Sequence, residues 1–178
     1  MKLATTLLLF AAAVALTAKE PASARHIVGY KEPGRYAGWP ANHGIWQWGN
    51  EILVGFEVGH LKSATNYHAI DYERAEEHVL GRSLDGGETW TIEKPESLKP
   101  APGTRIAGVP AEPGGKPISE FPGQMDFSKP GFAMTFRMES FHVGPSRFYY
   151  AENKGKSWMG PFVFPTSVLP VQPRERTT

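Results

Sequence analysis

The stretch "SLDGGETW", from Ser83 to Trp90, carries the strongest fold signal in the chain. A short Asp side chain can accept hydrogen bonds from backbone N–H groups a few residues on, and Gly tolerates a positive φ. Ser and Thr hydroxyls add local bonds to the same turn. We therefore expect Ser83, Asp85, Gly87 and Thr89 to close a hairpin turn, with Trp90 buried beneath it. Asp85 is then structural rather than catalytic.

A second, degraded copy of this octet follows at residues 151–158, "AENKGKSW". It retains the spacing in Asn153, Gly155, Ser157 and Trp158. A strand-like run precedes each copy, "HVLGR" and "SRFYY", so the repeat is one of hairpins. Arg82 and Arg147 come before the two copies, and we expect both to bond a neighbouring hairpin.

The rest of the chain indicates an all-β protein. Its 19 Gly, 16 Pro and five Trp favour short strands joined by turns. Seven segments have strand character: "GIWQWG", "EILVGFEV", "EHVLGRS", "TWTIE", "GFAMTFR", "SRFYYAE" and "GPFVFP". Residues 94–130 hold eight prolines and are predicted to be irregular. Residues 60–76 are a second loop candidate with room for one short strand or helical turn.

The first 24 residues have the features of a signal peptide: Lys2, an apolar run from Leu3 to Leu16, and "ASA" at residues 22–24. We expect export to the periplasm or medium, and no membrane association after cleavage. A net charge of +1 with interspersed signs gives no footprint for nucleic acid. The absence of cysteine excludes disulfides, thiol catalysis and thiolate metal sites.

"SLDGGETW" matches the Asp-box, S-x-D-x-G-x-T-W, of the sialidase-like (BNR repeat) β-propellers, and the second copy resembles a degraded box. "YAGWPANHGIWQWGNEILVGF" at residues 36–56 also resembles the first-blade strands of bacterial exo-sialidases. The resemblance implies box turns at the rim of a six-bladed propeller, away from the substrate pocket. Residues 25–178 suffice for about two to three four-stranded blades. We therefore expect an incomplete propeller, an N-terminal part of a longer protein, with open edges that favour self-association.

The family resemblance also implies a substrate, a terminal sialic or related acidic sugar, whose carboxylate is bound by arginines. Arg137, at the end of "GFAMTFR", and Arg35, displaced from the family's usual position, are the candidate carboxylate ligands. For the acid that protonates the leaving group, Asp71 is preferred over Glu57 and Glu73 because it lies in the loop. The family's Tyr nucleophile and its partner Glu belong to later blades.

Two functions stay open: a sialidase-like glycoside hydrolase whose catalytic set is incomplete in this chain, and a non-catalytic glycan-binding or scaffold propeller. Trp39, Trp46 and Trp48 could stack on sugars, although packing between blades is favoured for the last two. The six histidines lack metal-site spacing, so we expect neither a metal nor another cofactor.

Overall fold

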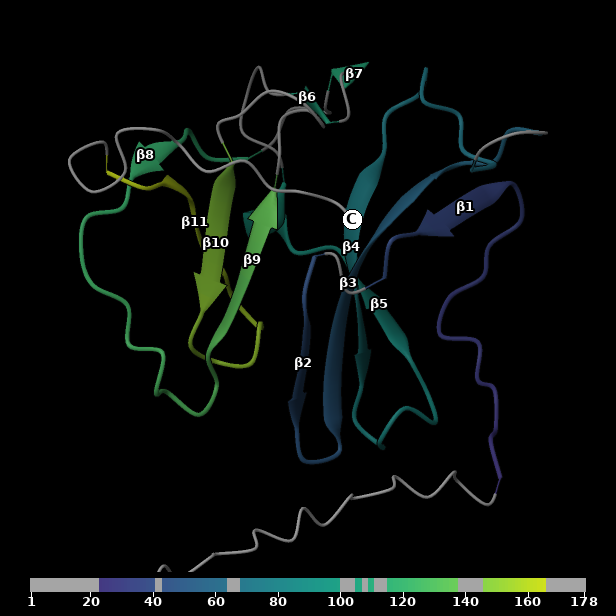
Figure 1. Cartoon of the computed structure of the whole chain (residues 1–178), viewed down its shortest axis with the longest axis horizontal. Helices are drawn as coiled ribbons and strands as arrows, with labels where there is room; N and C mark the ends of the chain where they lie inside the picture. Colours follow the sequence, from purple (N-terminus) through teal and green to yellow (C-terminus); the bar gives the residue numbers. More distant parts are fainter. Residues whose placement is uncertain are drawn as a thin grey trace, which may run out of the picture.

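The computed structural model describes residues 23–40, 43–63, 68–99, 105–106, 109–110, 115–137 and 146–165, so the predicted leader lies outside the described residues, apart from its last two. The described chain is all-β, as predicted. Its only helical element is the single 3-10 turn η1 (Glu96–Leu98), and its strands form two main sheets that stand side by side in Figure 1.

The first sheet contains the first box. Its strands are β1 (Arg35–Gly38), β2 (Ile45–Trp48), β3 (Glu51–His60), β4 (Glu77–Ser83) and β5 (Thr91–Glu93). Strands β2, β3, β4 and β5 form an antiparallel meander, and β1 pairs with the half of β3 that β2 leaves free. The long strand β3 therefore organises the whole sheet.

The second sheet contains the degraded box. Its strands run in the order β8 (Ser119–Glu120), β11 (Met159–Val163), β10 (Arg147–Ala151) and β9 (Ala133–Arg137). Strands β9, β10 and β11 form an antiparallel meander, whereas β8 is parallel to β11. A two-stranded hairpin, β6 (Arg105–Ile106) with β7 (Val109–Pro110), lies apart from both.

All seven predicted strands are present, within two residues of their expected bounds. The irregular character of residues 94–130 is confirmed in its described part, where the strands are two residues long. In residues 60–76 the described pairing is an isolated bridge between Leu61 and Ile70. Strand β1 was not predicted.

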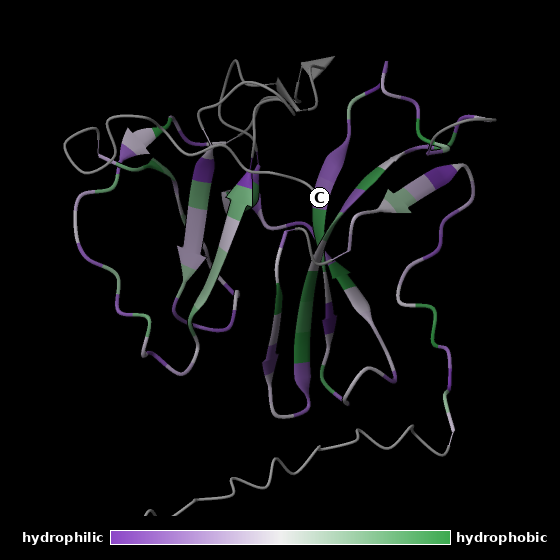
Figure 2. Ribbon diagram, in the orientation of Figure 1, coloured by the Kyte–Doolittle hydropathy of each residue, from purple (hydrophilic) through white to green (hydrophobic). Residues whose placement is uncertain are grey.

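The core lies between the two sheets, because alternate residues of each strand face the other sheet. Its buried members are Leu53, Leu80, Leu98, Ala133, Tyr149, Ala151 and Trp158. Trp46 and Trp48 pack against this cluster, and the Trp46 ring lies 5.6 Å from that of Trp158. The expected packing role of Trp46 and Trp48 is confirmed. Figure 2 shows hydrophobic residues along the middle of β3 and hydrophilic ones at its start.

The first box closes its turn as its residue types predicted. The Ser83 hydroxyl donates to Asp85 Oδ1 at 2.8 Å and accepts from the Gly87 N–H at 2.8 Å. The Asp85 carboxylate accepts from the Thr89 N–H at 2.9 Å and from the Thr89 hydroxyl at 2.6 Å. Trp90 Nε1 donates to the Gly87 carbonyl at 2.9 Å, but Trp90 is half-buried rather than fully buried as expected. Both Asp85 oxygens are thus used inside the turn.

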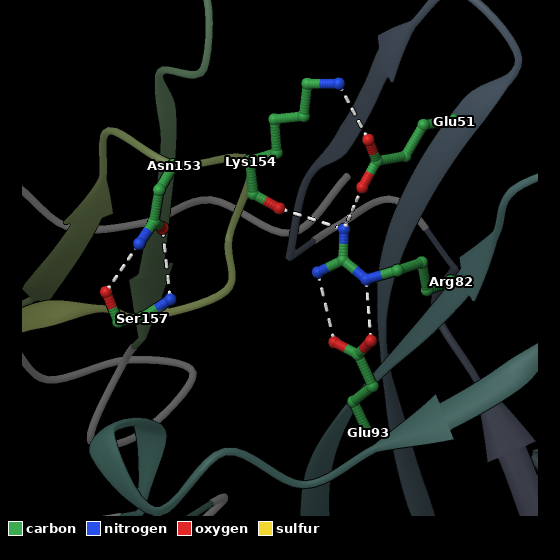
Figure 3. Close-up of polar contacts among 6 residues, drawn as sticks. All are labelled: Glu51, Arg82, Glu93, Asn153, Lys154 and Ser157. Atoms are coloured by element: carbon green, nitrogen blue, oxygen red, sulfur yellow. Dashed lines mark hydrogen bonds and ion pairs between the residues drawn. The ribbon is translucent and has the colours of Figure 1, made fainter.

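The degraded box keeps a reduced form of this bonding (Figure 3). Asn153 Oδ1 accepts from the Ser157 N–H at 3.1 Å, and Asn153 Nδ2 donates to the Ser157 hydroxyl at 2.7 Å. Lys154 stands in left-handed backbone, with a φ of 59°. Trp158 is buried in the core between the sheets.

Arg82 links the two box turns (Figure 3). Its guanidinium binds Glu93 through two bonds of 2.6 and 3.1 Å, Glu51 at 2.7 Å, and the backbone carbonyl of Lys154 in the second sheet at 2.9 Å. The predicted bond to a neighbouring hairpin is confirmed for Arg82. For Arg147, which lies opposite Arg137 at the start of β10 and away from its box turn, it stays a prediction.

We expect Arg82→Met to lower the free energy of unfolding by about 3 kcal/mol, because Arg82 is 7% exposed and its loss leaves Glu93 without its cation and Glu51 with Lys154 alone. Lys154→Met is the matched control. It removes a half-exposed ammonium that binds Glu51 but keeps the carbonyl that Arg82 binds, so it should cost less than about 1 kcal/mol. Urea unfolding of both variants checks this, and equal losses would contradict it.

The turn bonds hold the pKa of Asp85 at about 2, chiefly through the Thr89 hydroxyl and N–H. Because the folded state lowers this pKa, the stabilisation is complete above the ordinary value of 3.8 and is lost as pH falls through about 2. The difference in urea midpoint between the wild type and Asp85→Ala should therefore shrink from pH 5 to pH 2. Glu88→Gln is the control, since the Glu88 carboxylate pairs with Arg25 instead, and a constant Asp85 difference would refute the assignment.

Candidate functional site

The two sheets have a box end and an opposite end, which we call the cluster end. In Figure 1 both box turns lie at the lower end of the sheets. The cluster end holds the end of β3, the start of β4, the end of β9 and the start of β10, as the registers Glu57↔His78 and Arg147↔Arg137 require. Polar and charged side chains converge there between the sheets.

His43, Glu57 and His78 form the centre of this group. Glu57 and His78 face each other across β3 and β4, and His43 lies just before β2. His78 Nε2 lies 2.7 Å and His43 Nε2 lies 3.1 Å from the same oxygen, Glu57 Oε1. The two imidazole rings are 4.4 Å apart.

Both sheets fix the position of His43. The Gly55 N–H donates to the Gly44 carbonyl at 2.8 Å, and a Cβ on Gly55 would come within 2.8 Å of His43 Cβ. A glycine at position 55 is therefore required for this close approach. From the second sheet, the Thr135 hydroxyl donates to the His43 carbonyl at 2.6 Å.

Arg137, one of the two predicted carboxylate ligands, belongs to this group. Its side chain is 3% exposed, and its Nη1 donates to the Thr135 hydroxyl and, at 2.7 Å, to the Phe136 carbonyl. Its charge acts on both imidazoles: burial lowers the pKa of His43 and brings that of His78 to about 3, and Arg137 acts in the same direction. Both histidines are therefore neutral at pH 7.

Two carboxyl groups belong to the cluster, and their pKa values are shifted in opposite directions. Burial opposes ionisation of Glu57, but the His78 hydrogen bond and the two imidazoles beside it hold its pKa below the ordinary value. Burial and the adjacent Glu57 raise the pKa of Glu76 to about 8. A protonated Glu76 can donate a hydrogen bond to Glu57, which two ionised carboxylates could not form.

The other predicted residues lie at the same end but make separate contacts. Arg35 binds His60 at 3.0 Å and Glu77 at 2.6 Å. Because Glu77 and His78 are consecutive in β4, Arg35 and the histidine cluster lie on opposite faces of the first sheet. The structure thus does not bring Arg35 and Arg137 together.

Asp71, the predicted acid, stabilises a turn. Its Oδ1 accepts from the Glu73 N–H at 3.2 Å and contacts Lys62 Nζ at 3.4 Å. These contacts, the Glu73 N–H foremost, lower the pKa of Asp71, so the group is ionised at neutral pH. The alternative Glu73 is an exposed residue near Lys62, whereas the alternative Glu57 is the cluster carboxylate.

Three aromatic rings, those of Tyr36, Trp39 and His68, border the cluster end. The Trp39 ring lies 5.7 Å from Tyr36 and 5.1 Å from His68. Trp39 has a φ of 50°, a strained value for a bulky residue. Strain of this kind is maintained only where the surroundings or the function require it.

A cavity of about 410 Å³ lies on the other face of the first sheet, away from the cluster. Tyr30, Val54, Phe56 and Trp90 contribute to its largely apolar lining. Trp90 is the box tryptophan, so we interpret the cavity as a gap between the side chains that pack on that face.

The cluster residues other than Arg137 and Glu57 were not predicted from the sequence. Except for Glu76 and His78, they are far apart in the chain, and they follow no metal or catalytic spacing. One local signal was present: Gly55 interrupts the apolar run of β3, and glycine inside a strand often marks a close approach by another part of the chain.

Comparisons of the chain with protein-family models, with curated proteins and with solved structures gave no match. Among the described residues, no helix has the length and apolar character needed to cross a bilayer.

We expect the wild type to lose stability as pH rises towards 8, because a raised folded-state pKa gives Glu76 a contribution that is complete below 4.5 and is lost through about 8. Glu76→Gln, which imitates the protonated form, should remove this dependence. Comparing the urea midpoints of the wild type and Glu76→Gln at pH 6.5 and pH 8 isolates the effect of Glu76. Glu120→Gln, a change at an exposed glutamate of β8, is the control. Parallel slopes for Glu76→Gln and the wild type would contradict the assignment.

Proposed function

We propose that the cluster end contributes to a recognition site for a terminal acidic sugar of the sialic acid class, on a sialidase-like propeller scaffold. The observation that carries the proposal is the placement of the buried Arg137 at the end of the sheets opposite the box turns, where Asp71 and, on the other face of the first sheet, Arg35 also lie. A glycan site of this kind needs cationic groups for the carboxylate and aromatic faces for the sugar ring.

The surroundings of the arginines support an anionic ligand. Arg137 is held in a low-dielectric setting, where a positive charge acts strongly on nearby groups. The rings of Tyr36, Trp39 and His68 supply apolar faces at the same end. The two meander sheets packed face to face, each with its box turn at the same end, support the propeller scaffold.

Of the two activities, non-hydrolytic binding is the better supported. A general acid must be protonated at the working pH. The lowered pKa of Asp71 keeps it ionised, and its carboxylate is used in a turn. The hydrolase alternative makes a distinct prediction: turnover of a fluorogenic sialoside that falls strongly in Asp71→Asn.

The binding test compares N-acetylneuraminic acid with its methyl ester, which lacks the charge. Isothermal titration of the wild type should show the acid binding about tenfold or more tightly, the value of one charge-assisted hydrogen bond. In Arg137→Gln the acid should lose this advantage and the ester should be unaffected.

Arg25→Gln is the matched control, since Arg25 pairs with Glu88 at the box end. It should bind the acid as the wild type does. Equal binding of acid and ester to the wild type would reject an acidic-sugar site. Unchanged discrimination in Arg137→Gln would remove Arg137 from it.

A further inference from the structure

We propose that His43, Glu57 and His78 form a binding site for a divalent transition-metal ion of the Zn²⁺ class. The inference is independent of the proposed sugar site, because it rests on these three side chains alone. Nitrogen from imidazole and oxygen from carboxylate are the donors that Zn²⁺ accepts in proteins that lack cysteine ligands.

The donor geometry fits a single ion. One donor atom from each residue lies within 4.8 Å of the other two. The two Nε2 atoms are 2.7 and 3.1 Å from Glu57 Oε1. Zinc bonds of about 2.0–2.2 Å in tetrahedral geometry place ligand atoms roughly 3.3–3.5 Å apart, so small side-chain shifts are sufficient.

The hydrogen bonding of His43 independently points to a ligand. The residue is 4% exposed, and neither ring nitrogen has a hydrogen bond of normal geometry to any residue in the described part of the chain. A buried polar group in this condition calls for an explanation, and an ion is one of the few available. Nε2 points to Glu57 at 3.1 Å without meeting the angle of a hydrogen bond.

The backbone fixes the ligand positions before any ion binds. Glu57 and His78 are held by direct pairing of β3 with β4. His43 is fixed from the first sheet through Gly44 and from the second through Thr135. Ligands on rigid strands give a preorganised site.

Proton balance gives the proposal a specific signature. His78 Nε2 now shares a proton with Glu57 Oε1, and that proton must leave Nε2 before the nitrogen can bind a metal. Because His78 is neutral and keeps its one ring proton, the proton moves to Nδ1 of the same ring. Three protein ligands leave at least one position open for water or an exogenous donor.

The guanidinium of Arg137 limits the metal affinity of the site. Its charge acts on both histidines, so it also opposes a bound cation. Arg137→Gln should therefore bind the metal more tightly than the wild type, in contrast to its expected loss of acidic-sugar binding. This opposite sign separates the failure of one proposal from the failure of the other.

The test is a titration of the full chain, after treatment with a chelator, with Zn²⁺ against a chromophoric competitor and with Co²⁺ followed by absorption. We expect one equivalent of metal per chain and a Co²⁺ spectrum typical of nitrogen and oxygen ligands. Affinity should fall more than roughly 100-fold in His78→Gln and in His43→Gln, since loss of outer partners alone costs 10–100-fold.

Two further variants keep the result interpretable if a histidine variant fails to fold. Glu57→Gln preserves size and a hydrogen bond to His78 but removes the charged donor, so it should also bind weakly. Gly55→Ala keeps all three ligands and displaces His43, so it should reduce affinity with little change in circular dichroism.

His60→Gln is the matched control, because His60 binds Arg35 on the opposite face of the sheet. It should bind metal as the wild type does. The proposal is overturned if the wild type takes up no stoichiometric metal, or if His60→Gln and His78→Gln lose affinity equally.

Discussion

The buried guanidinium of Arg82 joins the two sheets at the place where their turns meet. A charge in this position is tolerated only when its donors are satisfied, and here two carboxylates and one backbone carbonyl do so. The carbonyl belongs to Lys154, in left-handed backbone of the second box. The turn of the second sheet thus satisfies a donor of the first, and this contact links the two sheets at their box end.

Because Arg82 links the two sheets at the box end, the polar side chains at the cluster end are not needed for that link. The polar side chains of the first box form hydrogen bonds with one another, as Asp85 does with Ser83 and Thr89. Between the ends, Leu53 and Leu80 are fully buried in an apolar layer that separates the two polar networks. Beyond it, Arg137 and the histidines lie in a low-dielectric environment in which charges act strongly on one another.

The sequence was informative where the signal was local. Short apolar segments between turn residues predicted the strands, and the spacing of Ser83, Asp85, Gly87 and Thr89 predicted the turn in detail. Strand β1 was not predicted because "RYAG" is short, lies between Gly34 and the Trp39–Pro40 pair, and pairs with residues 19 to 25 positions later in the chain. The cluster was not predicted because its residues come together only in the folded chain. His43 reaches Glu57 and His78 only after β3 has paired with β2 and β4. The spacing of residues along the chain does not predict such a contact. The two sheets also do not define the closed ring of a propeller.

The charges at the cluster end connect its two proposed ligands. Glu57 is the ionised carboxylate of the cluster, and the buried Arg137 and Arg147 lie at the same end. The protonated Glu76 and the two neutral histidines of the cluster add no net charge at pH 7. A divalent cation bound to Glu57 would leave the cluster with excess positive charge. A carboxylate bound nearby would relieve that excess, and the open position on the metal would offer it a direct contact. Because coupling between two binding equilibria is reciprocal, an acidic ligand would then strengthen metal binding by the same factor as the metal strengthens its own. A site with a buried arginine beside a histidine–carboxylate group therefore favours a cation and an anion together over either one alone.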